Sequence, residues 1–432
     1  MNRFIVISSL LLVLALEVYA EGTVVETSFY SQAMGQEKSV RVYLPEGYDT
    51  QGWGRYPVIY YLHGAGQMLG HDDFLDVTAA LDDLIAAGDI KPVLAVCPDG
   101  FAAPYPAAFY TSSVLYGDLE GYMTYDLVNW MDDNYRTIPS HRKRVIMGHS
   151  MGGYGALKYW AEHQDLYCCA AAVCGSGLDL PVMLSINIYG VLGELTGPPY
   201  YYYPGAGFAN AVLFSMSGAF SPNLGNPPYY VDLPLDEYAN YISEIWALWM
   251  QHNLPQYMQE LGGGGPNTPA IYMDAGTQDQ FYILPACMAF TDSLDELGIP
   301  YEFQVFEGGH FDKLHERFPI AIEFLCSYMH HTWGCSGDSQ TGVTTEVFGI
   351  HAAASVPGSN EGIISFELLS PGNVAVNLYD MSGRLVGTPL DGPAAVGSHT
   401  VRVEGSSLAE GMYFYSISSQ GERVTGKLLI LH

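Results

Sequence analysis

Apolar runs of strand length alternate with amphipathic segments of helix length from residue 22 to about residue 333. The runs are almost continuously hydrophobic, which is typical of parallel strands that are covered on both faces. They predict strands at 57–62, 92–97, 144–147, 170–174, 270–273 and 302–306. The segments between them predict helices at 74–87, 126–135, 151–163, 286–297 and 311–329. This alternation predicts an α/β domain over residues 21–334, with a mostly parallel sheet and helices on both faces.

The hydrophobic period changes to two near the C-terminus. Short alternating runs, separated by turn signals, predict strands at 364–368, 374–379, 400–403, 412–416 and 423–431. This spacing predicts a small all-β, immunoglobulin-like sandwich over residues 346–432. Residues 335–345 are rich in Gly, Ser and Thr and are predicted to form the linker between the two domains.

Residues 178–254 break the rhythm of the first domain. They are dense in Tyr, Pro, Gly and Met and carry few strand or helix signals. A loop of this length inside a compact domain is usually a lid or a binding surface, so we expect a lid-like insertion here. Its tyrosines have two interpretations, because they can stack on a ligand or pack the lid onto the domain.

The first twenty residues have the pattern of a signal peptide. Arg3 supplies a positive start, residues 4–16 form an apolar run, and Val18 and Ala20 are small residues at the expected cleavage positions. The run is shorter than the roughly 20 apolar residues that a membrane-spanning helix needs. We therefore expect residues 1–20 to be removed and the mature protein to be secreted or placed at the cell surface.

Charge and composition exclude several classes of function. The chain has 432 residues, of which 46 are acidic and 16 basic, for a net charge of −30. This excess repels a phosphate backbone, so no nucleic-acid partner is expected. An apolar fraction of 49% is enough for a large core and excludes a disordered chain. No nucleotide-binding loop, zinc-ligand spacing or haem motif is present, and we predict no cofactor and no metal.

The seven cysteines all lie between Cys97 and Cys335. Cys97 and Cys174 fall in apolar runs, where a thiol usually behaves as a small hydrophobic group. Cys326 and Cys335 flank the end of a predicted helix. Because export permits oxidation, they form the best local hypothesis for a disulfide.

A G-x-S-x-G motif at residues 148–152 connects a predicted strand to a predicted helix. Gly148 and Gly152 remove the Cβ atoms that would clash in a sharp turn of this kind. The turn would project the Ser150 hydroxyl above the sheet. It would also place the Met151 N–H at a helix N-terminus, where it can donate to an oxyanion.

The loop after the first predicted parallel strand carries His63 and two glycines. Such a loop can supply the second donor of an oxyanion hole, and we assign this role to the N–H of Ala65. We interpret His63 as a residue that orients the loop and not as the catalytic base. In proteins with a G-x-S-x-G elbow of this kind, the base follows the acid along the chain.

Candidates for the acid and the base follow later strands. Asp279 lies in the loop beyond a strand and can fix an imidazole, whereas Asp274 lies on the strand and is interpreted as structural. His310, on a glycine-flanked loop, can act as base and then as acid. His315 is expected at the surface, and the pair His330-His331 lacks ligand partners at metal-binding spacing.

The first domain resembles the esterase D-like, or putative esterase, family of the α/β-hydrolases. That family includes feruloyl and acetyl-xylan esterases, S-formylglutathione hydrolases and mycolyltransferases. The matching strings stand in order at 40–45, 47–49, 56–64, 98–100, 135–137, 148–156 and 308–310. The resemblance implies the α/β-hydrolase fold. By position, it also implies Ser150 as nucleophile, Asp279 as acid and His310 as base, with Met151 and Ala65 as oxyanion donors.

The tail resembles the C-terminal sorting domain of type IX secretion cargo. The matching strings are 374–386, 408–415 and 427–431. The resemblance implies recognition by the outer-membrane secretion machinery. A plain immunoglobulin-like adhesion module is the alternative interpretation.

These observations favour an exported serine carboxylesterase that forms an acyl-enzyme through a Ser-His-Asp triad. A feruloyl or acetyl ester of a polysaccharide is the expected substrate class, because aromatic side chains of the insertion can stack on sugars or phenolic groups. Two alternatives remain: an acyltransferase that passes the acyl group to a sugar hydroxyl, and a catalytically silent surface or adhesion protein on the same fold.

Overall fold

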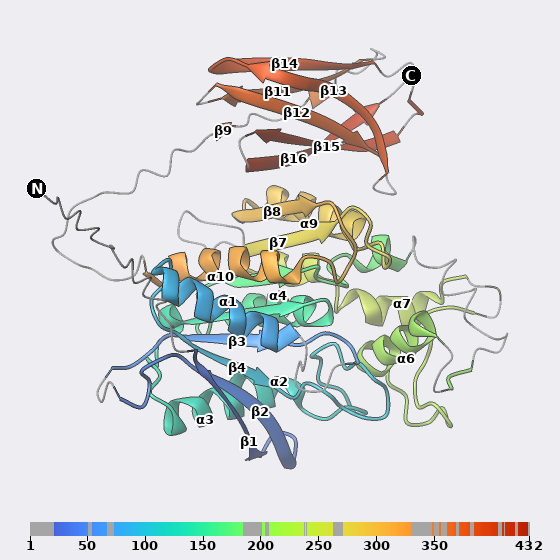
Figure 1. Cartoon of the computed structure of the whole chain (residues 1–432). Coiled ribbons are helices and arrows are strands. Elements are labelled where there is room, and N and C mark those ends of the chain that lie inside the picture. The colour runs from blue at the N-terminus through green and yellow to red at the C-terminus, as the bar shows by residue number, and fades with distance from the viewer. Residues whose placement is uncertain are drawn as a thin grey trace, which may run out of the picture.

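The computed structural model describes most of the chain between residues 21 and 430 (Figure 1). Its gaps are 51–53, 67–72, 185–200, 204–206, 237, 239, 262–270, 331–347, 350–353, 356–360, 369–370, 381–383, 405–407, 410 and 420–421. The predicted signal peptide, the predicted linker, Cys335 and His331 lie outside the described residues. The hypothesis of a Cys326–Cys335 disulfide therefore stays a prediction.

An eight-stranded sheet organises the first domain, in the order β1-β2-β4-β3-β5-β6-β7-β8. Strands β3 to β8 are parallel, and β2 pairs antiparallel with both β1 and β4. The strands are β1 (Thr23–Ser31), β2 (Gln36–Leu44), β3 (Val58–Leu62), β4 (Leu94–Pro98), β5 (Arg144–His149), β6 (Ala170–Val173), β7 (Ile271–Gly276) and β8 (Tyr301–Phe306). The mostly parallel α/β-hydrolase architecture expected from the sequence is confirmed.

Helices cover both faces of this sheet. Successive side chains of a strand point to opposite faces, so a strand of apolar residues contributes to a buried cluster on each face. On β3, Tyr60 belongs to one buried cluster and Tyr61 to the other. Helices α1 (Asp73–Ala87) and α10 (Leu314–His330) pack together over the Tyr61 face (Figure 1). The other face is covered by α3 (Leu127–Asn134), α4 (Met151–Glu162) and α9 (Ile283–Leu297). Short helical turns occur at α2 (Leu119–Gly121), Tyr122–Asp126 and His141–Lys143.

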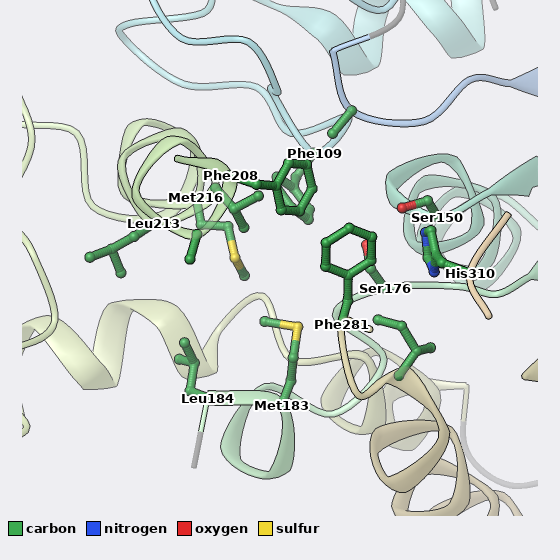
Figure 2. A pocket seen from close by; sticks show the side chains of 14 residues that line it. Phe109, Ser150, Ser176, Met183, Leu184, Phe208, Leu213, Met216, Phe281 and His310 are labelled. Carbon is green, nitrogen blue, oxygen red and sulfur yellow. The ribbon is translucent and has the colours of Figure 1, made fainter. Parts of the chain in front are cut away.

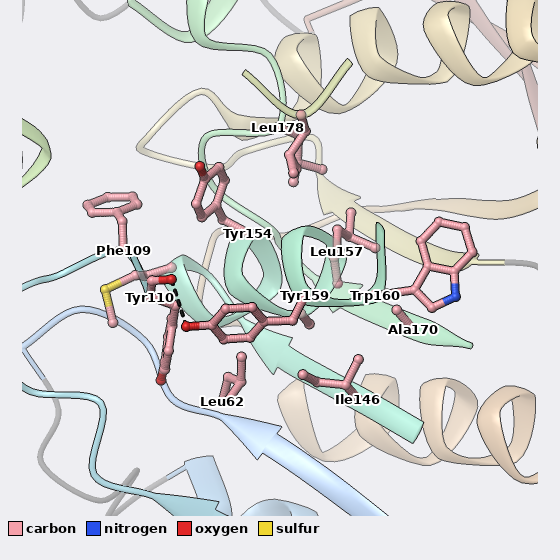
Figure 3. Close-up of a cluster of buried hydrophobic side chains, with 14 of the residues drawn as sticks. Leu62, Phe109, Tyr110, Ile146, Tyr154, Leu157, Tyr159, Trp160, Ala170 and Leu178 are labelled. Carbon is pink, nitrogen blue, oxygen red and sulfur yellow. Dashed lines mark hydrogen bonds between the residues drawn. The ribbon is translucent and has the colours of Figure 1, made fainter. Parts of the chain in front are cut away.

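The aromatic core under α4 fixes the loops around the sheet. Tyr159 of α4 donates its hydroxyl to the carbonyl oxygen of Tyr110 at 2.8 Å (Figure 3). Trp160 and Tyr154 of the same helix are fully buried beside it. Strand β5 and helix α4, which flank Ser150, are therefore anchored by large buried side chains.

The insertion at 178–254 is more helical than the sequence indicated. It contains α6 (Phe208–Phe220) and α7 (Ser243–Met250), and α8 (Leu254–Glu260) follows directly. Helix α6 was missed because it is apolar on almost every side, so no amphipathic period marks it. Among the tyrosines of the insertion, Tyr202 packs against Tyr105 at 4.8 Å between ring centroids, which is the packing role, whereas Tyr201 and Tyr203 are exposed.

The tail forms two antiparallel sheets, as expected for a small β-sandwich. One sheet has the order β10-β11-β14, with β9 also paired to β11, and the other has the order β13-β12-β15-β16. The strands are β9 (Phe348–Gly349), β10 (Ala354–Ser355), β11 (Glu361–Leu368), β12 (Gly372–Tyr379), β13 (Leu385–Ala394), β14 (Gly397–Glu404), β15 (Gly411–Ser419) and β16 (Glu422–Ile430). Strand β13 was not expected, because Pro389 and Pro393 argue against a strand; its place at a sheet edge tolerates them.

Within the part of the chain that the structure describes, no helix combines the length and the hydrophobicity needed to cross a bilayer. The six cysteines described there are all buried and unbridged.

Candidate active site

Ser150 occupies a strained turn between β5 and α4. Its backbone angles are φ 56° and ψ −120°, a conformation that is unfavourable for a residue with a side chain. Glycine is required on both sides of it. A Cβ on Gly152 would lie 1.8 Å from the Leu62 carbonyl oxygen, and one on Gly148 would lie 2.3 Å from the oxygen of Gly152. The motif therefore builds the sharp elbow that the sequence predicted.

Asp279 and His310 form a buried carboxylate–imidazole pair. Asp279 lies on the turn between β7 and α9, and His310 lies on the loop between β8 and α10. Oδ2 of Asp279 is 2.7 Å from Nδ1 of His310, and both side chains are 1% exposed. The Phe281 N–H donates to the other carboxylate oxygen at 2.8 Å. The carboxylate is thus fixed by the backbone and in turn fixes the imidazole.

A cavity lies at the elbow, next to the imidazole of His310. Ser150 and His310 both belong to the wall of this cavity and lie next to each other in it (Figure 2). Nε2 of His310 is buried and has no hydrogen-bond partner among the described residues. The structure therefore brings Ser150, His310 and Asp279 together in the order hydroxyl, imidazole, carboxylate.

The two expected oxyanion donors lie at a helix N-terminus and on a loop, as the sequence predicted. Met151 is the first residue of α4, directly after Ser150, and Ala65 follows β3 and lines the same cavity. His63 fixes the loop that carries Ala65. Its Nε2 accepts the N–H of Gly100 at 2.9 Å, and its Nδ1 lies 2.9 Å from the Gly64 carbonyl oxygen. Burial lowers the pKa of His63, so the ring is neutral and serves as a bridge between loops.

Asp274 has a different set of partners from Asp279. Arg317 donates to both of its carboxylate oxygens, at 2.6 and 3.1 Å, and the Cys174 N–H donates at 2.8 Å. All of these groups are buried. Asp274 is therefore part of a buried ion pair, which agrees with its interpretation as a structural residue.

Removing the Asp274 carboxylate should destabilise the first domain. Asp274→Ala leaves the Arg317 guanidinium buried without its counter-charge, so we expect the free energy of unfolding to fall by about 3–5 kcal/mol. All six tryptophans of the chain precede residue 346, so the tryptophan fluorescence during urea unfolding reports the first domain alone. The matched control is His315→Ala, which removes an exposed pair with Glu316 and should cost less than about 1 kcal/mol. Equal losses for the two variants would contradict this prediction.

A second buried Asp–His pair, which was not predicted from the sequence, lies against the first. Nδ1 of His149 is 2.8 Å from Oδ2 of Asp73, and Nε2 of His149 lies 3.3 Å from the backbone oxygen of His310. The two imidazole rings are 4.9 Å apart. His149 is the second residue of the G-x-S-x-G motif, so its place on a buried strand next to Ser150 was the available signal. The pair supports the loop that carries His310.

Two groups of described side chains have donor atoms close enough to hold a metal ion. In the first, Cys174 joins Asp279 and His310, but the carboxylate and the imidazole already bind each other. In the second, Glu120 and Glu162 lie near His163, with the Lys158 ammonium 3.5 and 3.3 Å from the two carboxylates. Neither group supports a metal site.

Comparisons with known families assign both parts of the chain. The model of the family described as "Putative esterase" matches residues 31–313. The model of the secretion system C-terminal sorting domain matches residues 356–431, which indicates a protein that is secreted or attached to the cell surface. Both resemblances that the sequence analysis stated are confirmed.

Curated relatives carry esterase names. An esterase of Mycobacterium tuberculosis strain H37Rv is 29% identical over 286 residues, which are 65% of this chain and 54% of the relative. An endo-1,4-beta-xylanase/feruloyl esterase of Xylanibacter ruminicola is 29% identical over 144 residues, which are 31% of this chain and 19% of the relative. The chain thus spans about half the length, or less, of these relatives.

Solved structures with a similar chain trace include two ferulic acid esterases. One is 19% identical with a TM-score of 0.49 and covers 71% of this chain and 99% of its own. The other, from Anaeromyces mucronatus, is 18% identical with a TM-score of 0.47 and covers 72% of this chain and 94% of its own.

Proposed function

The chain belongs to the Putative esterase family, and we propose that it is an exported serine carboxylesterase. Ser150 is the nucleophile, His310 the general base and acid, and Asp279 the residue that orients the imidazole. One observation carries the proposal: an imidazole that is fixed by Asp279 and has no partner for its second nitrogen among the described residues shares the wall of one cavity with a serine on a strained elbow.

The first half of the reaction forms an acyl-enzyme. Ser150 Oγ bonds to the carbonyl carbon of the ester while its proton passes to Nε2 of His310. The carbonyl oxygen becomes an oxyanion, which the N–H groups of Met151 and Ala65 stabilise. When this intermediate collapses, the bond to the alcohol oxygen breaks, and the alcohol leaves with the proton from His310.

Water completes the reaction by the same route. His310 takes a proton from a water molecule, whose oxygen bonds to the acyl carbon. The second tetrahedral intermediate then releases the carboxylic acid and restores the Ser150 hydroxyl. Asp279 stays ionised throughout and stabilises the imidazolium that forms in each half.

Support for the substrate class comes from the relatives and the tail. A relative named an endo-1,4-beta-xylanase/feruloyl esterase supports a feruloyl ester of a polysaccharide as the substrate, and an acetyl ester is the alternative that the family resemblance implies. The sorting domain supports a partner role for the outer-membrane secretion machinery. Both statements are part of the proposal.

The test of the proposed activity is release of acid and alcohol from a panel of esters. Purified chain is incubated with acetyl, alkanoyl and feruloyl esters, and both products are quantified by chromatography. Equal amounts of acid and alcohol, absent with Ser150→Ala, are expected. A folded chain that turns over no ester would favour the catalytically silent scaffold.

The acid limb of the pH profile should lie at an unusually low pH. Burial lowers the pKa of His310 from its ordinary value of 6.5, against the opposing effect of the hydrogen bond to Asp279. The imidazole accepts a proton only while it is neutral, so activity is expected to persist at pH 6.5 and to fall below it. The measurement is kcat/KM against pH with a non-ionising ester. A midpoint above 6.5 would contradict the prediction.

A further inference from the structure

His149 lies where three segments of the candidate active site meet. It is the last residue of β5, directly before Ser150, and its side chain is fully buried. Its ring centroid is 4.9 Å from that of His310. A Cβ built on Gly64 would lie 3.7 Å from Nδ1 of His149, so the loop that carries Ala65 also passes close to the ring. One buried side chain therefore borders the elbow, the loop of an expected oxyanion donor and the loop of the base.

Both ring nitrogens of His149 face oxygen atoms. Nδ1 is 2.8 Å from Oδ2 of Asp73, and Nε2 is 3.3 Å from the backbone oxygen of His310. A backbone oxygen can only accept a hydrogen bond, so this second contact requires a hydrogen on Nε2. The contact with Asp73 requires another hydrogen, between Nδ1 and the carboxylate. The partners thus indicate a ring that is protonated at both nitrogens, with the carboxylate as its counter-charge.

The singly protonated form of His149 fits this place poorly. With its one hydrogen on Nδ1, the ring would turn the lone pair of Nε2 towards the lone pairs of the His310 oxygen. Because the ring is fully buried, the hydrogen bond that is lost there carries a cost in free energy. Asp73 is the first residue of α1, and a helix N-terminus stabilises a carboxylate. The surroundings therefore favour an imidazolium next to an ionised Asp73.

Other titratable groups near Asp73, on β3, on the loop that follows it and on β4, stay neutral. Burial raises the pKa of the Tyr61 hydroxyl and of the Cys97 thiol, and it lowers the pKa of the His63 imidazole. These three groups therefore add no charge beside Asp73. The positive charge that offsets the carboxylate comes from His149.

The charged groups that face His310 come from three other elements. Asp279 lies on the turn between β7 and α9, Arg317 on α10 and His149 on β5. Burial lowers the pKa of His310 most, the hydrogen bond to Asp279 raises it, and the positive charges of His149 and Arg317 lower it. The ring of His149 thus acts on the base through its charge as well as through the contact with its loop.

We propose that His149 is a positioning residue, whose doubly protonated ring holds the loop of His310 next to Ser150 (Figure 2). Asp73 keeps the ring in this state by binding its other side. The inference rests on the proposed function, because it takes His310 as the base. If the pair served folding alone, the contact with Asp73 would matter and the hydrogen on Nε2 would not.

Two substitutions separate the roles of the ring nitrogens. In His149→Gln the amide reaches the place of Nε2 and can still donate to the His310 oxygen, but it leaves the place of Nδ1 empty. In His149→Asn the shorter amide takes the place of Nδ1 and can still donate to Asp73, but the donor to His310 is lost. We expect kcat to fall about a hundredfold in His149→Asn and roughly tenfold or less in His149→Gln, because a small displacement of the base has a large effect. KM should change little in both.

The order of stability separates this role from a purely structural one. His149→Asn keeps the contact with Asp73, so its free energy of unfolding, from tryptophan fluorescence in urea, should be at least that of His149→Gln. The more stable variant is thus expected to be the less active one. His163→Asn, at the C-terminal end of α4, is the control and should keep the wild-type kcat. A kcat of His149→Asn equal to or above that of His149→Gln would overturn the inference.

The acid limb of the pH profile is a second readout, which a purely structural role would not move. In His149→Gln the Asp73 carboxylate stays while the positive charge of the ring is lost, so the limb of kcat/KM should move to higher pH. The double variant Asp73→Asn/His149→Gln carries no charge at either position and should move the limb back towards the wild-type pH. A wild-type acid limb in His149→Gln would contradict the doubly protonated ring.

Nuclear magnetic resonance of the wild-type chain, labelled with ¹⁵N-histidine, tests the ring without relying on a variant that folds. We expect one buried ring with two N–H signals that exchange slowly with water at neutral pH. The absence of such a ring would overturn the inference.

Labelling with a small fluorophosphonate distinguishes failure of this inference from failure of the proposed function. Wild-type chain that carries the label on Ser150, combined with the reverse order of the two His149 variants, refutes only the positioning role. A folded wild-type chain that takes no label refutes the proposed function.

Discussion

Replacing Ser150 with alanine is expected to lower kcat for ester hydrolysis by about a millionfold, the loss typical of a triad nucleophile. The variant has no atom that can form the acyl-enzyme, so the remaining rate would come from binding and the oxyanion donors alone. The fold should persist, because the substitution keeps the Cβ and the strained backbone of the elbow.

Ser176→Ala is the matched control for this loss. Its hydroxyl is on the same cavity wall, but Ser176 does not stand on the strained elbow between β5 and α4, so kcat should change far less. The measurement is kcat with a chromogenic ester, at enzyme concentrations fixed by active-site titration of the wild type. A Ser150→Ala variant with more than a small fraction of wild-type turnover would show that another group is the nucleophile.

Asp279→Asn should lower kcat by about ten-thousandfold at neutral pH. An asparagine in this place keeps the shape of the side chain but can donate to Nδ1 of His310. It would therefore favour the tautomer whose proton sits on Nε2, the atom that must accept the Ser150 proton. The charge that stabilises the imidazolium is lost as well.

The chain supplies its own control for this prediction in Asp274. Asp274→Asn alters a carboxylate near the same end of β7 that is paired with Arg317 and not with His310. Its kcat, measured at a temperature where both variants are folded, should fall much less than that of Asp279→Asn. Equal losses in kcat would mean that Asp279 does not act through the imidazole.

Most of the first domain could be predicted because its central strands are buried on both faces. Residues 57–62 and 145–147 are continuous apolar runs, and the structure places β3 and β5 there. Strand β1 escaped prediction because it lies at the edge of the sheet, where exposed polar residues interrupt the hydrophobic pattern. Strand β13 escaped for a related reason, since an edge permits the prolines that a central strand excludes.

The side chains that meet in the candidate active site could be predicted because local chemistry marks each of them. Ser150 stands between two glycines, at positions where a Cβ atom would clash with the backbone. Asp279 and His310 stand on loops after predicted strands. In this fold such loops meet at the carboxyl edge of the sheet, so order along the chain was enough. The same edge brings Ser150 and His310 into one cavity.

The supporting contacts could not be predicted, because they depend on residues far apart in the chain. His149 is paired with Asp73, 76 positions earlier, and no sequence motif contains both residues. Part of the cavity wall comes from α6, whose Phe208 packs against Phe281, and tertiary structure alone sets this contact. A sequence pattern records the chemistry of a position, but it does not record which distant side chain covers it.

The most direct measurement is peptide mapping by mass spectrometry after reaction of the full chain with a fluorophosphonate. If a serine on a tight turn is activated by an imidazole, one phosphonyl group should be found, on the peptide that contains Ser150, and His310→Ala should abolish it. A stoichiometric adduct on any other residue, or none on folded wild-type protein, would contradict the account.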